Sequence, residues 1–361
     1  MPDRRPQRLA ALSERIQEAH LDALLLTSLP NIRYITGFSG TSALALVAPK
    51  DATLITDFRY QVQATAEVGD LARVVIEPQS LWAGLWRTLP AGPPCAIGFE
   101  SNHLVHRDFQ RLLEQGTRCQ WRPTLDIVES LREQKDEDEL ALIAKAARTA
   151  ECALEHAIRD VREGMTELQI AGCLERALRN AGSEGFPFPT IVASGERSAL
   201  PHARSSERAV QRGDFLLIDF GAVVGGYCAD VTRTFVIGEA TAEQREIHAI
   251  VREANERASR AIRAGMRGRD ADAVARGYIE DRGFGDAFGH SLGHGIGIEV
   301  HEAPRLARTA DTTLPPHAVV TIEPGIYKPG WGGVRIEDDV FLGDEGSRVL
   351  TAFSRDLIEI G

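Results

Sequence analysis

Residues 215–235 read FLLIDFGAVVGGYCADVTRTF, which is the pattern of a β-hairpin with one carboxylate on each strand. Apolar and β-branched residues fill both arms, and a pair of glycines between them supplies the turn. Folding the arms about Val224-Gly225-Gly226 places Asp219 opposite Asp230. Directly paired residues hold their Cβ atoms about 5 Å apart on one face of a sheet. We therefore predict a close pair of carboxylates.

A second hairpin repeats the arrangement. Residues 320–339 read VTIEPGIYKPGWGGVRIEDD, and folding them about Pro329-Gly330 pairs Glu323 with Glu337. Two acidic pairs at this spacing repel strongly unless cations lie between them. The alternative is that acidic side chains in hairpins simply face solvent. The apolar residues before Asp219 and around Glu337 argue against that alternative, because buried carboxylates need partners.

A count of charges turns this problem into a prediction of metal ions. The four carboxylates carry four negative charges, which two divalent cations would balance. Two metals about 3.5–4 Å apart can activate water and polarise a carbonyl group. A set of oxygen ligands with one imidazole and no thiolate suits Mn²⁺, with Co²⁺ and Zn²⁺ as alternatives, rather than a structural zinc.

A cluster of histidines lies between the two hairpins in sequence. Residues 289–302 read GHSLGHGIGIEVHE and contain His290, His294 and His301. The interleaved glycines argue against a simple helix and allow the backbone to approach a ligand closely. A single histidine is more often structural than a ligand, but three beside two acidic hairpins favour metal binding. The pattern alone does not select which of the three binds.

The length of the chain and the order of its predicted helices and strands indicate two domains. With 361 residues the chain exceeds one ordinary core. Residues 1–128 alternate short apolar strands with helical segments, which predicts a small α/β domain. Residues 129–361 begin with a long periodic helix and continue with helices grouped around β-hairpins, which predicts an α+β catalytic domain.

The composition excludes several classes of function. A net charge of −11 argues against a nucleic-acid-binding protein. No apolar run approaches the roughly 20 residues of a transmembrane helix, so we expect no membrane association. The five cysteines are scattered and form no CxxC motif, which is typical of free thiols in a reducing cytosol. We therefore expect a cytoplasmic protein.

The motifs together resemble the pita-bread metallopeptidases, specifically the Xaa-Pro branch of aminopeptidase P and prolidase. The resemblance covers nearly the whole chain, including a creatinase-like N-terminal domain. It implies five metal ligands: Asp219, Asp230, His294, Glu323 and Glu337. It also implies that Glu323 serves as the general base for a water that bridges the two metals.

The resemblance further assigns residues to the substrate side of the site. His202, in Leu-Pro-His-Ala, matches the histidine that the family places beside the substrate. His290 would line the proline pocket, and His301 would contact the carbonyl near the scissile bond. Arg335 and Tyr327 would support the ligands and the substrate. The alternative for these two is an arginine that pairs with Asp338 or Asp339, and a packed tyrosine.

The choice between two peptidase activities depends on the N-terminal domain. Residues 31–44 and 56–64 resemble the aminopeptidase P pattern, and residues 39–46 contain no basic side chain to bind a dipeptide's carboxylate. We therefore hypothesise an Xaa-Pro aminopeptidase acting on peptides with proline at the second position. The alternative is an Xaa-Pro dipeptidase. Methionine aminopeptidase and a non-catalytic pita-bread binding protein are more remote.

The resemblance also implies an assembly of several copies. A homo-oligomer, either a dimer or a tetramer, is expected, with residues 1–128 as its contact surface. The same N-terminal domain is expected to select the length of the substrate.

Overall fold

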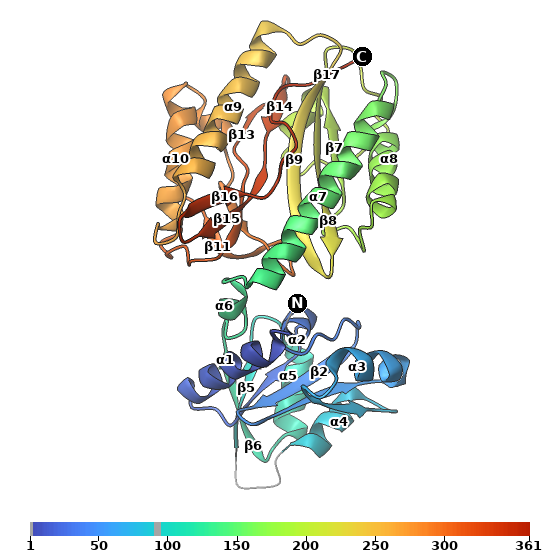
Figure 1. The fold of residues 1–361 in the computed structure, drawn as a ribbon, viewed down its shortest axis with the longest axis vertical. Coiled ribbons are helices and arrows are strands. Elements are labelled where there is room, and N and C mark those ends of the chain that lie inside the picture. Colours follow the sequence, from blue (N-terminus) through green and yellow to red (C-terminus); the bar gives the residue numbers. More distant parts are fainter. Residues whose placement is uncertain (1–2, 90–94) are drawn as a thin grey trace. The chain divides into compact units, whose positions relative to one another are not determined.

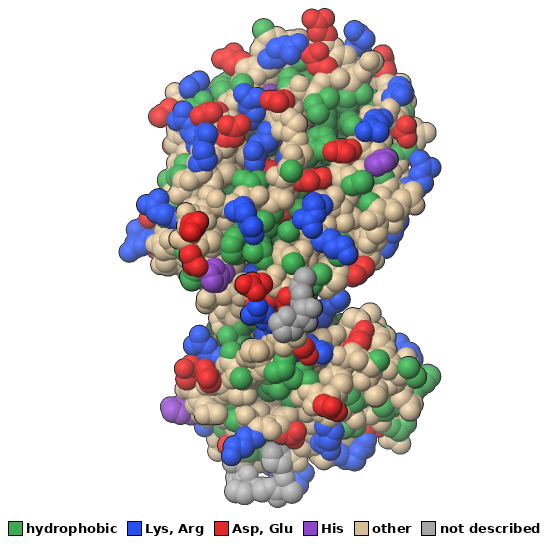
Figure 2. Space-filling view, viewed as in Figure 1, with side chains coloured by type: hydrophobic (Ala, Val, Ile, Leu, Met, Phe, Trp, Pro, Cys, Tyr) green, Lys and Arg blue, Asp and Glu red, His purple; other side chains and the backbone are tan. Residues whose placement is uncertain are grey.

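The computed structural model describes residues 3–89 and 95–361 (Figure 1). The chain divides into two compact units, residues 1–132 and residues 133–361, which we describe separately. Of the helices in the described residues, none combines the length and apolar character that crossing a membrane requires. In Figure 2, acidic and basic side chains are interspersed over the visible face of the second unit.

The first unit is built around a six-stranded mixed sheet with the order β4-β3-β2-β1-β5-β6. Its strands are β1 (Ala23–Leu26), β2 (Ala43–Ala48), β3 (Asp51–Thr56), β4 (Arg73–Ile76), β5 (Cys95–Glu100) and β6 (Cys119–Thr124). Its helices are α1 (Arg5–Glu18), α2 (Leu29–Thr36), α3 (Gln61–Val68), α4 (Leu81–Thr88), α5 (His106–Gln115) and the short α6 (Glu129–Arg132). The pairs β1–β5, β5–β6 and β3–β4 are parallel, which agrees with the predicted α/β alternation.

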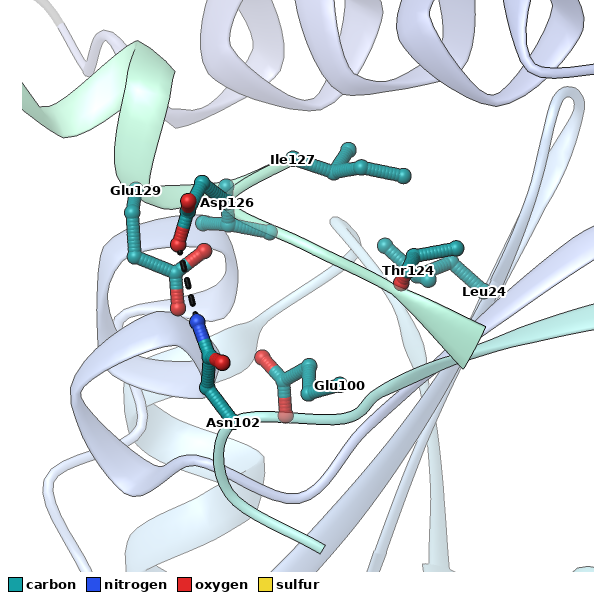
Figure 3. Close-up of a pocket in the computed structure, with 8 residues that line it drawn as sticks. Leu24, Glu100, Asn102, Thr124, Asp126, Ile127 and Glu129 are labelled. Carbon is teal, nitrogen blue, oxygen red and sulfur yellow. Dashed lines mark hydrogen bonds between the residues drawn. The ribbon is translucent and has the colours of Figure 1, made fainter. Parts of the chain in front are cut away.

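A buried carboxylate fixes the start of helix α2 in this unit. Glu100, at the end of β5, accepts hydrogen bonds from the backbone N–H groups of Thr27 (2.6 Å) and Ser28 (2.8 Å). It also accepts one from the Asn31 amide at 2.7 Å. Figure 3 shows Glu100 beside a cavity of about 10 Å³, room for roughly one water. Burial raises the pKa of Glu100, and these donors oppose that shift.

One half of the second unit packs two helices against a four-stranded sheet. The helices are α7 (Glu137–Asp160) and α8 (Glu167–Asn180), and the sheet has the order β17-β9-β8-β7. Its strands are β7 (Ile191–Ser194), β8 (Phe215–Val224), β9 (Tyr227–Ile237) and β17 (Glu359–Ile360). Leu154 of α7 and Leu174 of α8 belong to the same buried cluster as Ile218 and Phe235.

The other half packs α9 (Ala242–Ala261) and α10 (Gly268–Asp281) against a five-stranded sheet of order β11-β10-β12-β15-β16. The strands are β10 (Gly293–Gly295), β11 (Glu302–Leu306), β12 (Val319–Ile322), β15 (Asp338–Gly343) and β16 (Gly346–Val349). A separate ribbon pairs β13 (Gly325–Lys328) with β14 (Gly332–Arg335). Figure 1 shows α9 and α10 on one side of the unit's strands and α7 and α8 on the other. The predicted α+β architecture is confirmed.

Candidate metal centre

The first hairpin carries Asp219 on β8 and Asp230 on β9. Asp219 pairs with Thr232, and Asp230 pairs with Gly221, so the direct pairing predicted for the two aspartates is wrong by two residues. The cause is the turn: β8 runs to residue 224, and the two-residue turn that follows has positive φ at both glycines, 58° and 78°. An offset of two keeps both carboxylates on one face of the hairpin.

The second hairpin carries Glu323 and Glu337 in the register that the sequence predicts. The β13–β14 ladder pairs Gly325 with Arg335, and the β12–β15 ladder pairs Ile322 with Asp338. Both ladders have the same register, and the two glutamates oppose each other in the gap between them. Their side chains therefore project from neighbouring points on the two strands.

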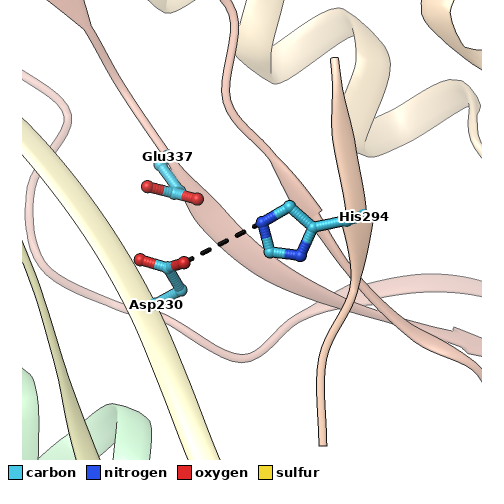
Figure 4. Close-up of side chains that lie close together, drawn as sticks. All are labelled: Asp230, His294 and Glu337. Atoms are coloured by element: carbon cyan, nitrogen blue, oxygen red, sulfur yellow. Dashed lines mark ion pairs between the residues drawn. The ribbon is translucent and has the colours of Figure 1, made fainter. Parts of the chain in front are cut away.

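His294 lies on β10 with its Nε2 atom directed at the carboxylates (Figure 4). Its Nδ1 is 3.0 Å from the carbonyl oxygen of Gly295, which can only accept, so Nδ1 carries the proton. Nε2 is 3.5 Å from Oε1 of Glu323 and 4.0 Å from Oδ2 of Asp230. Burial lowers the pKa of His294 to about 4. The ring is therefore neutral at pH 7 and offers the Nε2 lone pair to a metal.

The donor atoms converge as a metal site requires. One ligand atom each from Asp230, His294 and Glu337 lie within 4.8 Å of one another. In the part of the chain that the structure describes, the Oδ1 atoms of Asp219 and Asp230 are buried without a hydrogen-bond partner. Buried carboxylate oxygens rarely remain unsatisfied, so these atoms fit a cation.

The electrostatics of the cluster lead to the same conclusion. Burial, followed by the charge of Glu337, raises the pKa of both Asp230 and Glu323 well above the usual range. Burial and the charge of Asp219 raise the pKa of Glu337 to about 8. The carboxylates repel one another and hold protons that a divalent cation can replace.

Hydrogen bonds from Arg335 and Thr232 connect two of the candidate ligands, Asp219 and Glu337. Arg335 donates to Asp219 Oδ2 at 2.6 Å, to Thr232 Oγ1 at 3.1 Å and to Tyr327 Oη at 2.9 Å. Thr232 Oγ1 in turn donates to Glu337 Oε2 at 2.6 Å. Arg335 therefore bonds to one candidate ligand directly and to a second through Thr232.

The alternative partners of Arg335 are occupied elsewhere. Asp338 accepts from Arg233 at 2.8 Å and from Arg355 at 2.6 Å. Asp339 accepts from the backbone N–H of Asp230 at 3.1 Å. The acidic residues that follow Glu337 thus fix the backbone around the site and leave Arg335 to Asp219.

The candidate substrate residues lie around the same cluster. Tyr327 Oη is 2.8 Å from His290 Nε2. Because His290 Nδ1 is 2.8 Å from the carbonyl oxygen of Ser291, which can only accept, Nδ1 carries the proton of the neutral ring and the Tyr327 hydroxyl donates to Nε2. Burial lowers the pKa of His290 to about 4. The His301 ring lies 4.4 Å from the His294 ring. His202 is exposed in a turn and interacts electrostatically with both His290 and His301.

The glycines around His294 leave space for neighbouring parts of the protein itself. A Cβ atom added to Gly293 would lie 1.9 Å from the carbonyl oxygen of Thr321, and one added to Gly295 would lie 2.1 Å from that of Ala303. At Gly297 it would meet the Glu302 carboxylate at 2.7 Å. The close approach expected for a ligand is instead an approach of neighbouring backbone at Gly293 and Gly295 and of the Glu302 side chain at Gly297.

Two residues of the site were not predicted. Thr232 follows Asp230 by two residues and therefore shares its face of β9, which is a signal the period of a strand provides. Asn255, in the middle of α9, donates from its amide to the carbonyl oxygens of Ile322 (2.8 Å) and Ile336 (3.2 Å). No local pattern marks this asparagine.

Each of the two units matches a known protein family. Residues 141–344 match metallopeptidase family M24, and residues 8–134 match the creatinase/prolidase N-terminal domain. An Xaa-Pro dipeptidase of Pyrococcus horikoshii is 34% identical over 98% of this chain and 99% of its own. The solved Xaa-Pro dipeptidase from Bacillus anthracis is 40% identical with a TM-score of 0.93, covering 98% and 99% of the two chains. The X-Pro aminopeptidase from Thermotoga maritima is also 40% identical, with a TM-score of 0.90 and the same coverage.

Proposed function

Because this chain belongs to metallopeptidase family M24, we propose that it is a peptidase that hydrolyses the Xaa-Pro bond of dipeptides. The named relatives in Pyrococcus horikoshii and Bacillus anthracis are Xaa-Pro dipeptidases, and each is covered over almost its whole length. These relatives support the dipeptidase more strongly than the aminopeptidase that the sequence motifs favoured. The observation that carries a metal-dependent hydrolysis is the convergence of His294 with buried, mutually repelling carboxylates.

We propose that two divalent cations, most suitably Mn²⁺, are held by Asp219, Asp230, His294, Glu323 and Glu337. When bound, such ions supply Lewis-acid polarisation and lower the pKa of water. Glu323 is the proposed general base for the attacking water. Its Oε1 atom lies 3.5 Å from His294 Nε2, so the carboxylate would stand beside a water held at the proposed metal site and could receive its proton.

The proposed substrate residues have roles that follow from their chemistry. His202 and His301 would donate hydrogen bonds to the carbonyl group of the peptide. His290 would form part of the wall of the proline pocket, where its hydrogen bond from Tyr327 holds the ring neutral and fixed. Arg335 and Tyr327 would position other residues of the site. Arg335 bonds to Asp219 and to the Tyr327 hydroxyl, and the Tyr327 hydroxyl bonds to His290.

The test is a pair of assays on the full-length protein. We expect Mn²⁺-dependent cleavage of Xaa-Pro dipeptides, with loss of the activity in Glu323→Gln although that variant stays folded. Absence of Mn²⁺ binding at micromolar metal would overturn the enzymatic proposal. A protein that binds Mn²⁺ without cleaving any proline peptide would overturn the substrate alone.

An Xaa-Pro aminopeptidase is the second candidate. It is supported by the likeness to the Thermotoga maritima X-Pro aminopeptidase and by the absence of a basic residue between positions 39 and 46. A site without a cation for the dipeptide carboxylate would also accept longer peptides. Comparing Xaa-Pro with Xaa-Pro-Xaa substrates separates the two: a strict dipeptidase cleaves only the former.

The remote alternative functions, the oligomeric state and the cellular location also stay at the level of proposals. The relatives named above are Xaa-Pro peptidases, so they give methionine aminopeptidase and a non-catalytic binding protein less support. We propose a homo-oligomer, a dimer or tetramer, with residues 1–128 contributing to its contacts and to the choice of substrate length. Sedimentation analysis would measure the number of subunits. The cytoplasmic location stays a prediction from cysteine usage.

A further inference from the structure

Asn255 occupies an unusual position relative to the two glutamates of the candidate site. Its side chain is completely buried in α9, and its amide nitrogen donates to the carbonyl oxygens of Ile322 and Ile336. These are the residues immediately before Glu323 and Glu337. One amide therefore holds both strand segments from which the two carboxylates project.

The strands need this donor because of a proline. Extending the common register of the two ladders places Pro324 opposite Ile336, and the N–H of Ile336 donates to the carbonyl of Pro324 at 3.4 Å. In an antiparallel sheet the opposite residue would return a hydrogen bond to Ile336 from its own N–H. Proline has no N–H. The Asn255 amide donates to the carbonyl oxygen of Ile336 in its place.

The backbone of the two glutamates is directed away from their shared ladder. The N–H of Glu323 donates to the carbonyl of Leu292 at 2.8 Å, and that of Glu337 donates to the carbonyl of Thr232 at 3.1 Å. Glu323 and Glu337 are thus a non-hydrogen-bonded pair of the ladder, in which the two side chains lie close together. Within the described residues, the Oδ1 atom of Asn255 is buried without a partner, so the amide's contribution is the pair of bonds to the strands.

We propose that Asn255 is a positioning residue that sets the spacing of Glu323 and Glu337 by supplying the donor that Pro324 lacks. The inference rests on the proposed metal-dependent function. It assigns to α9, which carries none of the candidate ligands, a direct role in the geometry of the proposed metal ligands.

The first measurement is metal affinity in the folded protein, by calorimetric titration of the metal-free full-length chain with Mn²⁺. We expect Asn255→Ala to weaken Mn²⁺ binding roughly ten- to a hundredfold, the range typical for groups that orient metal ligands. Asn255→Leu, which fills the space without a donor, should weaken it similarly. Ser259→Ala is the matched control, because Ser259 is buried one turn later on α9 and its hydroxyl has no partner among the described residues.

The second measurement tests the mechanism through Pro324. Pro324→Ala restores a backbone N–H opposite Ile336, so the double variant Asn255→Ala/Pro324→Ala should recover part of the affinity that Asn255→Ala loses. Amide hydrogen exchange in residues 320–338 of the metal-free protein should be faster in Asn255→Ala and slower again in the double variant. This readout needs neither metal nor substrate.

The outcomes separate the possibilities. A lower unfolding temperature with unchanged Mn²⁺ affinity in both Asn255 variants would reduce Asn255 to a structural residue and overturn the proposal. Equal affinities in Asn255→Ala and the double variant would overturn the role of Pro324. If the wild-type chain binds Mn²⁺ but cleaves no proline peptide, the proposed substrate fails while this inference stands.

Discussion

Replacing Glu337 with glutamine tests whether the acidic cluster is a metal site held at an energetic cost. The folded protein raises the pKa of Glu337 to about 8, whereas an ordinary glutamate titrates near 4.5. Between these values the folded state holds a proton that the unfolded chain has released. The contribution of Glu337 to the stability of the metal-free protein therefore falls as the pH rises through this window.

The size of the effect follows from the two pKa values. Between pH 6 and pH 8 a single group with this shift removes about 2 kcal/mol of folding free energy, at up to ~1.4 kcal/mol per pH unit. Glutamine has a similar shape and no charge to release. We therefore compare the change in folding free energy from pH 6 to pH 8 in the two proteins. We expect this change to be about 2 kcal/mol more favourable to the folded state in Glu337→Gln than in the wild type.

The assay is urea unfolding of the chelator-treated protein at the two pH values, repeated with saturating Mn²⁺. Added metal should stabilise the wild type strongly and the variant weakly, because a ligand that binds only the folded state shifts unfolding by mass action. Glu345→Gln is the control, since Glu345 is exposed in a turn of the same unit. Equal pH dependence in wild type and Glu337→Gln would refute the reasoning.

Three further perturbations address other parts of the molecule. Thr232→Val removes the hydroxyl that donates to Glu337, and we expect a loss of about 1–3 kcal/mol of stability with weaker Mn²⁺ binding, measured by urea unfolding and calorimetry. Gly293→Ala would place a Cβ atom 1.9 Å from a backbone oxygen of β12, so it should lower the unfolding temperature and the Mn²⁺ affinity together. The thiols of Cys95 and Cys119 lie 3.2 Å apart on paired strands, and an excess of a small-molecule disulfide should link them, detected as a reducible cross-link between tryptic peptides and absent in C119S.

The sequence singled out residues that the structure brings together, but it predicted their geometry less well. The register of Glu323 and Glu337 followed from locating their turn, because the pairing of a hairpin depends only on the turn centre. Asp219 and Asp230 were placed two residues out of register, because the turn centre lies between the two glycines and not before them. Both aspartates still share a face, so the error left the predicted cluster intact.

Residues that act from a distance in sequence could not be predicted in this way. Asn255 lies in a helix whose periodic pattern identifies only its buried face. Its partners, the carbonyls of Ile322 and Ile336, are backbone groups that leave no trace in side-chain identity. The orientation of His294 likewise depends on a bond to the Gly295 carbonyl, which only the folded chain defines.

The wide separation of the candidate ligands in the chain has a consequence for how the protein folds. Asp219 and Glu337 lie at opposite ends of a segment that must form β8, β9, β10 and both glutamate strands before the donor atoms meet. Contacts of such long range close late, because their loop entropy must be overcome first. Metal binding should therefore occur only after the two sheets have packed together during refolding. It can serve as a signal for that last step. Stopped-flow refolding with and without Mn²⁺ would reveal it as a phase slower than the formation of secondary structure.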